Sequence, residues 1–386
     1  MAEVRRLQDL VAADPTGLDH RRELGTALLQ LLRETDDPSL YGPALTAFEA
    51  ALTKSPDDPE LLTGIAAVQL GMHRFADALV TADRAIALSP GLVTAHAARV
   101  DALVELGRYD DADAAAGLMF GLASDLTTLS RVSYLAELRG QLEPAVTAMR
   151  LAASRPTAVP ENAAFASALL GNLLLYSGDR AGAQAAYRSA LRIVPNHAPA
   201  LAGEGRLAVA EGRLDEAIRL FGDAVNVLPS AEHLIALGDA QEAAGQADAA
   251  ERSYERARAR LELEASFGVA VDVDLALFEA DHGDVRSALA HAKAADRQAS
   301  TIGSAHAVAW ALHRLGRDPD AARYLAKALR LGSIDPLLRY HAGVIEAALG
   351  QEAKARRDLA LALATDPGFS ATGALAARQL LATIGE

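Results

Sequence analysis

The amino-acid sequence predicts an all-α fold, a solenoid of paired helices. Three observations predict it. Apolar residues make up 51% of the chain and aromatic residues only 4%, and the surplus is alanine and leucine, which favour helices. One short pattern of glycine, alanine and a larger apolar residue recurs at a period of about 34 residues. No stretch alternates between apolar and polar residues long enough to predict a strand.

The recurring pattern describes a helix, a turn and a second helix, which we call helix A and helix B. Residues 170–195 carry glycine, glycine, alanine, tyrosine, alanine and proline in a fixed order. The same frame, with an aromatic or apolar residue at the tyrosine position and the proline absent from the second segment, returns in the segments that begin at Gly205, Gly238 and Gly343. Glycine ends helix A because it adopts the left-handed cap conformation at little cost. The predicted turn glycines are separated by 33 to 38 residues and are Gly107, Gly140, Gly178, Gly212, Gly245, Gly283, Gly316 and Gly350.

Small residues predict where the paired helices cross, because a small side chain lets two helix axes approach closely. They are the early glycines of helix A and the first alanine of helix B: Gly171, Gly205, Gly238 and Gly343, and Ala112, Ala145, Ala183, Ala217, Ala250, Ala288, Ala321 and Ala355. We expect Tyr187, Phe221 and Tyr254 to fill the space between one unit and the next.

Taken in order, the chain begins with an amphipathic helix over residues 4–13, followed by about ten helix pairs and a last helix over residues 371–384. Both outer helices are expected to cap the array. Helix B of the later units is expected to end near Ser89, Ala123, Arg155, Val194, Leu228, Glu262, Ala299, Leu331 and Thr365. We predict one domain, 1–386, with longer connections at 156–162 and 262–271 that divide it into sub-blocks 1–155, 156–262 and 263–386.

This frame resembles the tetratricopeptide repeat family over nearly the whole chain. The resemblance implies a right-handed superhelix whose A helices line a concave groove that binds a peptide or a protein segment. Residues 273–284, 309–317 and 340–345 resemble bacterial, actinobacterial-type members, a resemblance that assigns no role. The carried-over groove residues are Tyr134, Asn172, Arg206, Glu232, Asp239, His306, Trp310, His313, Tyr340 and His341. A lysine clamp for terminal carboxylates, known in the family, has no counterpart beyond Asn172 and Arg206.

One helix A carries the sharpest local feature. His306, Trp310 and His313 have spacings of four and three, which place them on one helix face. Trp310 is the only tryptophan, and the sequence leaves open whether it anchors a partner or fills the interior. With His341, these histidines suggest the second hypothesis, a metal- or small-ligand-binding accessory protein. No carboxylate or thiol stands at ligand spacing beside them, so we predict no metal and no cofactor.

No motif predicts catalysis, and we expect a scaffold rather than an enzyme. The polar turn over residues 281–284 is explained by ordinary turn chemistry. A third hypothesis, self-assembly through the end helices, also stays open.

The formal charge is −14, which argues against nucleic acid as a partner and favours a basic protein or peptide. Residues 1–130 hold 10 Lys and Arg against 20 Asp and Glu, so this attraction should be strongest there. No segment is apolar over the length of a membrane span. The chain has no cysteine, and residues 1–6 lead into a helix without an export signal. These features fit a cytoplasmic protein and an exported one equally well.

Overall fold

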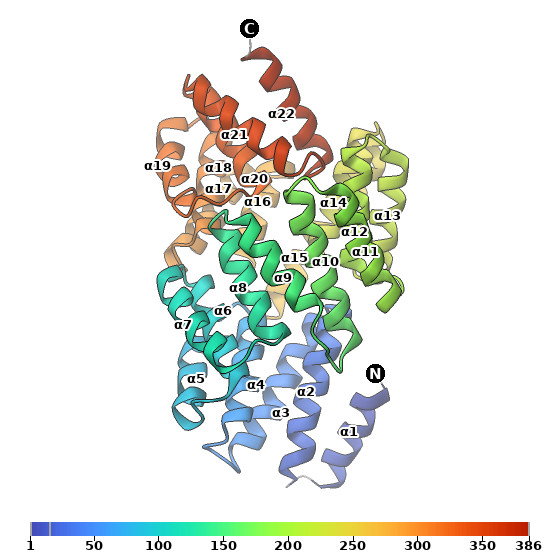
Figure 1. Cartoon of the computed structure of the whole chain (residues 1–386), viewed down its shortest axis with the longest axis vertical. Helices are drawn as coiled ribbons and strands as arrows, with labels where there is room; N and C mark the ends of the chain where they lie inside the picture. Colours follow the sequence, from blue (N-terminus) through green and yellow to red (C-terminus); the bar gives the residue numbers. More distant parts are fainter. Residues whose placement is uncertain (1, 15–16, 385–386) are drawn as a thin grey trace. The chain divides into compact units, whose positions relative to one another are not determined.

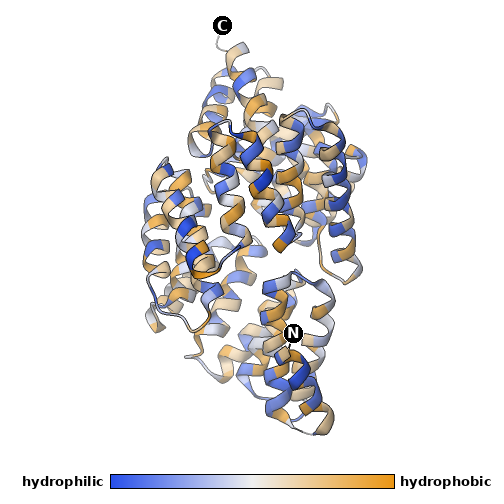
Figure 2. Ribbon diagram, turned by 90° about the vertical axis from the view of Figure 1, so that its right-hand side faces the viewer, coloured by the Kyte–Doolittle hydropathy of each residue, from blue (hydrophilic) through white to orange (hydrophobic). Residues whose placement is uncertain are grey.

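The computed structural model describes residues 2–14 and 17–384, and it is built from α-helices joined by short turns (Figure 1). Two compact units are formed, residues 1–131 with 262–271, and residues 132–261 with 272–386. These two units differ from the three sub-blocks that the sequence predicts from the lengths of the connections. The three sub-blocks stay a prediction about where the chain is flexible. Apolar and polar residues are interspersed along the described helices, as Figure 2 shows. Within 2–14 and 17–384, no helix combines the length and hydrophobicity needed to span a membrane.

The first unit begins with the expected outer helix and continues with helix pairs. Its helices are α1 (Ala2–Ala13), α2 (Leu18–Thr35), the 3₁₀ turn η1 (Pro38–Leu40), α3 (Tyr41–Leu52), α4 (Pro59–Gly71), α5 (Phe75–Leu88), α6 (Val93–Glu105) and α7 (Tyr109–Leu122). The helix α8 (Leu126–Leu138) passes from the first unit into the second.

The second unit continues the pairs. Its helices are α9 (Leu142–Ala153), α10 (Pro160–Tyr176), α11 (Arg180–Ile193), α12 (Ala198–Ala210), α13 (Leu214–Val227), α14 (Ala231–Ala243), α15 (Ala247–Ser266), α16 (Asp272–His282), α17 (Val285–Gln298), α18 (Ile302–Arg314), α19 (Asp318–Ala328), α20 (Pro336–Ala348), α21 (Glu352–Thr365) and α22 (Ala371–Thr383). The end of α15 belongs to the first unit. This helix runs four residues beyond the predicted end at Glu262, and the other B helices end within a few residues of their predicted positions.

The turns between paired helices follow the predicted glycines with three informative differences. Seven of the eight glycines have a positive φ, and Gly283 does not. At Gly283 the Glu279 carboxylate accepts the Asp284 N–H at 2.7 Å, so a side chain organises this turn. In the first two pairs, Asp36 (φ 53°) and His73 (φ 56°) adopt the left-handed conformation without being glycine. His73 is held there by its contact with the Ala270 carbonyl oxygen, 2.7 Å from its Nδ1, inside the first unit.

The predicted small residues lie where the paired helices pack. All eight helix B alanines are buried. The early glycines of helix A are needed for more than the close approach of the helix axes, because each faces a large side chain of helix B. A Cβ on Gly171 would lie 2.4 Å from the ring of Tyr187, and one on Gly205 would lie 2.7 Å from Phe221. Tyr187 and Phe221 are buried, as expected for side chains that fill the space between one helix pair and the next.

The second unit closes on itself. The last helix, α22, contacts α14, α20 and α21, and α21 also contacts α10. In Figure 1, α22 is the dark red helix beside α21. A second closure brings the turn at Gly140 against Gly332, whose carbonyl oxygen would lie 2.5 Å from a Cβ on Gly140. Elements far apart in sequence therefore meet inside this unit, and α22 does more than cover the end of the array.

Candidate functional site: the inner face of the second unit

Three of the groove residues expected in the second unit lie against the segment that follows α21. Arg206 on α12, Asp239 on α14 and Tyr340 on α20 all contact residues 368–370. We call the surface formed by the sides of α8, α10, α12, α14, α18 and α20 that carry the residues described below the inner face. It carries three connected groups of polar and aromatic side chains.

The first group surrounds the Arg206 guanidinium. Arg206 donates to the side-chain oxygen of Asn172, and the Tyr187 hydroxyl donates to the same oxygen at 2.9 Å. Burial raises the pKa of the Glu137 carboxyl to about 7, with a further increase from the negative charge of Asp335 and an opposing effect of Arg206. This part of the inner face therefore combines one permanent cation with several recessed carboxyl groups.

Two more carboxyl groups belong to the Arg206 group. Asp335 caps α20 by accepting the Leu338 N–H at 2.7 Å. Solvent reaches the Asp335 carboxyl, yet enough protein surrounds it that burial raises its pKa. Asp366 is fully buried, accepts the Gly368 N–H at 2.8 Å, and also has its pKa raised by burial, with Arg206 opposing. Arg206 is the largest favourable influence on the ionised form of Asp366, whereas for Asp335 the backbone N–H groups of α20 lower the pKa more than Arg206 does.

The second group surrounds Asp239. The Tyr254 hydroxyl lies 3.0 Å from Asp239 Oδ1 and 2.8 Å from Glu242 Oε2, and the Ser370 hydroxyl donates to Asp239 Oδ2 at 2.7 Å. Burial raises the pKa of Asp239 to about 6, although both hydroxyl hydrogen bonds lower it. The His282 ring stacks on Tyr254 with centroids 3.9 Å apart, and burial lowers the pKa of His282 to about 4. A neutral histidine and a doubly hydrogen-bonded carboxylate therefore sit side by side.

The third group contains Trp310, which is interior in this structure. Its indole is 4% exposed, stacks on His341 with centroids 3.6 Å apart, and donates to Asp281 at 2.8 Å. His341 Nδ1 lies 2.8 Å from His306 Nε2. Because burial lowers the pKa of His306 to about 4, the pair is neutral at pH 7, with one ring donating to the other. Of the two interpretations that the sequence leaves open, this geometry favours packing.

The three histidines do not converge on a common point. His306 and His341 bond to each other, and His313 Nδ1 contacts Asp318 at 2.6 Å. Within residues 2–14 and 17–384, no group of three or more histidine, aspartate or glutamate side chains is arranged to hold a metal ion. The hypothesis of a metal-binding accessory protein therefore gains no support from the geometry.

The predicted site residues differ widely in accessibility. Tyr134 on α8 and Glu232 in the first turn of α14 are exposed. Four others are partly buried and four are buried, and these are, respectively, Asn172, Arg206, His313 and Tyr340, and Asp239, His306, Trp310 and His341. Sequence reasoning did not find Glu137, Asp335, Asp366 or Ser370. Their only local signals were helix-capping patterns at Asp335 and Ser370, which identify a helix start and not a site.

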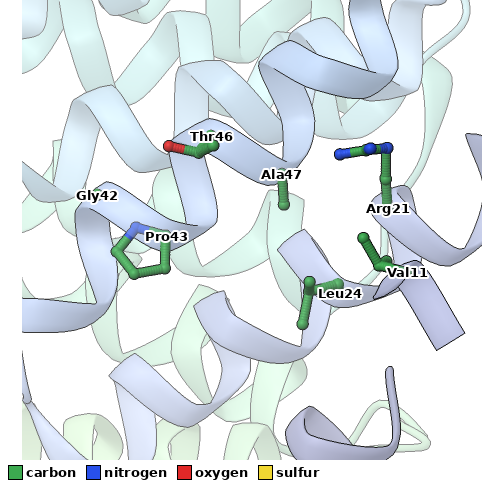
Figure 3. A pocket seen from close by; sticks show the side chains of 7 residues that line it. All are labelled: Val11, Arg21, Leu24, Gly42, Pro43, Thr46 and Ala47. Carbon is green, nitrogen blue, oxygen red and sulfur yellow. The ribbon is translucent and has the colours of Figure 1, made fainter. Parts of the chain in front are cut away.

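The first unit carries a depression of about 500 Å³ between α1, α2 and α3 (Figure 3). It is lined by Val11, Arg21, Leu24, Gly42, Pro43, Thr46 and Ala47. Its walls are largely apolar, and Arg21 is the only titratable group among these seven. This depression offers no pair of groups for acid–base chemistry, so the inner face of the second unit is the stronger candidate for a functional site.

Comparison with known proteins points to the same kind of repeat. A family model described as tetratricopeptide repeat matches residues 174–234. No curated protein matches the sequence.

Among solved structures, the chain is similar to one from the Cut9–Hcn1 hetero-tetramer of the APC/C, with 16% identity, a TM-score of 0.41, and coverage of 99% of this chain and 67% of that one. It is similar to yeast Tom70, with 14% identity, a TM-score of 0.34, and coverage of 94% and 95%. It is also similar to Pseudomonas aeruginosa pilF, with 18% identity, a TM-score of 0.43, and coverage of 51% and 89%. These likenesses carry no argument about function.

Proposed function

Because the chain is a tetratricopeptide repeat protein, we propose that it is a non-catalytic scaffold that binds a segment of a partner protein on the inner face of its second unit. One observation carries the proposal. Three residues that the repeat frame assigns to a binding groove contact a turn of polypeptide, here the chain's own residues 368–370: Asp239 and Tyr340 through their side chains and Arg206 through its backbone carbonyl. A surface that accommodates one such turn has the shape and hydrogen-bonding groups to accommodate another.

The charge of the inner face favours a basic partner segment. Glu137, Asp335 and Glu232 lie close enough to Arg206 or to one another for their charges to interact. Arg339 also acts on Asp335, so these three carboxyl groups outnumber the two guanidinium groups beside them. A lysine or arginine entering this region would pair with the Glu137 carboxyl, which has little water, and this strengthens the interaction. The sequence-wide charge of −14 would add to the rate of association at low salt.

The proposal is tested by selecting binders from a library of short random peptides on the immobilised full-length chain. We expect basic peptides to be enriched and their binding to weaken as salt rises. Glu137→Gln with Asp335→Asn removes two carboxyl groups that can ionise to pair with a basic peptide, while the new asparagine side chain can still cap α20, so binding should be lost and the fold kept. The matched control is Glu251→Gln with Glu255→Gln, which removes two charges from exposed positions on α15.

Peptides that bind the inner-face variant as well as the control would place the binding surface elsewhere. Failure to select any peptide would contradict the scaffold proposal. In either case a circular dichroism spectrum of each variant must match that of the wild type before binding is compared.

A further inference from the structure

Residues 367–377, which we call the C-terminal insert, fit the inner face through backbone contact. A Cβ on Gly368 would lie 2.2 Å from the Arg206 carbonyl oxygen and 3.1 Å from the Ala210 nitrogen. These are backbone atoms of α12, which cannot move aside as a flexible side chain can. Glycine at 368 is therefore required for the insert to lie this close to α12.

Two further contacts fix the orientation of the insert. The Ser370 hydroxyl donates to Asp239 at 2.7 Å and also accepts the Gly373 N–H at 2.9 Å, so one side chain both starts α22 and ties it to α14. The Phe369 ring lies against Tyr340 with centroids 5.5 Å apart. Glycine, an aromatic ring and a hydroxyl in three successive residues thus engage α12, α20 and α14.

The α22 part of the insert has only small residues among its buried positions. The buried residues of this helix are Ala371, Gly373, Ala374 and Ala377, and Leu375 is 48% exposed. Since hydrophobic stabilisation scales with the apolar area removed from water, α22 is held less strongly than a helix that buries leucine or aromatic side chains. No residue of α22 belongs to the described apolar cluster around Tyr187, so the contacts that hold α22 are separate from that core.

We propose that the C-terminal insert is an intramolecular ligand of the inner face, which a partner segment of the same chemistry must displace. That chemistry is a glycine, an aromatic residue and a serine or threonine at the start of a helix. A basic residue of the partner would pair in addition with the carboxyl groups around Arg206, which the insert does not do because it has no lysine or arginine. This inference rests on the proposed function, because it assigns the occupant of the same surface. The apparent affinity for a partner is then the intrinsic affinity multiplied by the fraction of molecules in which the insert is undocked.

The test uses the full-length chain and a fluorescein-labelled synthetic peptide corresponding to residues 364–384. Gly368→Ala should undock the insert through its contact with α12. The matched control is Gly222→Ala, because nothing lies within 4 Å of a Cβ built at that helical position. A second route to undocking is Phe369→Ala with Ser370→Ala, which removes the ring contact and the hydrogen bond to Asp239.

Hydrogen exchange monitored by mass spectrometry reports docking, and fluorescence anisotropy reports peptide binding. In both undocking variants we expect faster exchange over residues 366–384. We expect the peptide to bind these variants about tenfold or more tightly than the wild type or the Gly222→Ala control, which corresponds to an insert docked in about nine-tenths of molecules or more. A peptide carrying Phe369→Ala should bind more weakly than the native peptide.

Unchanged exchange in both variants would overturn the proposal, because the named contacts would then not hold the insert. Faster exchange without tighter peptide binding would also overturn it, because the vacated surface would not recognise the insert as a ligand. The proposed function fails by a different result, namely that peptides selected from the library ignore the inner-face charges. The two failures are therefore distinguishable.

Discussion

The packing of Tyr187 gives the sharpest stability prediction. Its ring is fully buried between two glycines, and its hydroxyl donates to Asn172. A Cβ on Gly203 would lie 2.3 Å from the ring, and a Cβ on Gly171 would lie 2.4 Å from it. Because carbon atoms pack favourably at about 3.5–4.0 Å, Gly203→Ala would require the ring to move by more than about 1 Å. The same close approach on the Gly171 side leaves the ring little room to move.

The magnitude follows from comparison with Gly222→Ala on α13. Both glycines are inside helices, so both substitutions gain the same helix propensity, about 1 kcal/mol. Only Gly203→Ala overpacks the core, at a cost of about 1–3 kcal/mol. The free energy of unfolding of the Gly203→Ala protein should therefore be about 1–3 kcal/mol lower than that of the Gly222→Ala protein.

Urea unfolding followed by far-ultraviolet circular dichroism measures this difference. Hydrogen exchange over α10–α13 checks that the loss is local, because repeat arrays do not always unfold in one step. Adding Tyr187→Leu to Gly203→Ala removes the ring and should recover part of the lost stability, which a double-mutant cycle quantifies. Equal stabilities of the Gly203→Ala and Gly222→Ala proteins would refute the inference that Gly203 packs directly against the Tyr187 ring.

Three further outcomes are expected from urea unfolding. The pKa of His306 is about 4 in the folded chain and 6.5 without the fold, so its contribution to stability falls by on the order of 3 kcal/mol as the pH drops from 6.5 to 4; a His306→Asn protein that keeps the full pH dependence would contradict this. The pKa of Asp239 is about 6 in the folded chain and 3.8 without the fold. Its contribution to the free energy of unfolding is therefore complete below pH 3.8 and is lost as the pH rises through 6, a change on the order of 3 kcal/mol. Asp239→Asn should remove this pH-dependent loss. Ala217→Leu should cost about 1–3 kcal/mol by overpacking a fully buried helix crossing, and a neutral result would mean that the repeat frame is misplaced at α13.

The paired helices were predictable because their determinants are local and repeated. Alanines such as Ala217 recur at a fixed place in each unit, and all of them are buried as expected. The errors in the frame have local causes as well. Helix α15 continues past Glu262 to Ser266 because no proline or glycine stops it before Gly268, which has a positive φ. Gly283 departs from the other turn glycines because the Glu279 side chain occupies that turn.

The candidate site was only partly predictable, because the repeat frame places residues on a helix face but does not say what covers that face. Arg206, Asp239 and Tyr340 were assigned to the groove from their positions alone. Whether solvent, a partner or the chain itself faces them depends on the contact between Asp239 and Ser370, which are separated by 131 residues. No period in the sequence encodes that separation, and the turn over residues 366–370 has the pattern of an ordinary helix stop.

The same distinction explains the position of Trp310. Its spacing from His306 and His313 correctly indicates one helix face, but the neighbouring helix α20 brings His341 flat against the indole, with 4° between the ring planes. The partly buried Tyr340, next to His341, is then the aromatic side chain that remains in contact with the insert. A substitution at Trp310 would perturb packing and binding together. Tyr340 is therefore the better position for testing recognition, because its ring contacts the insert without forming the centre of a buried stack.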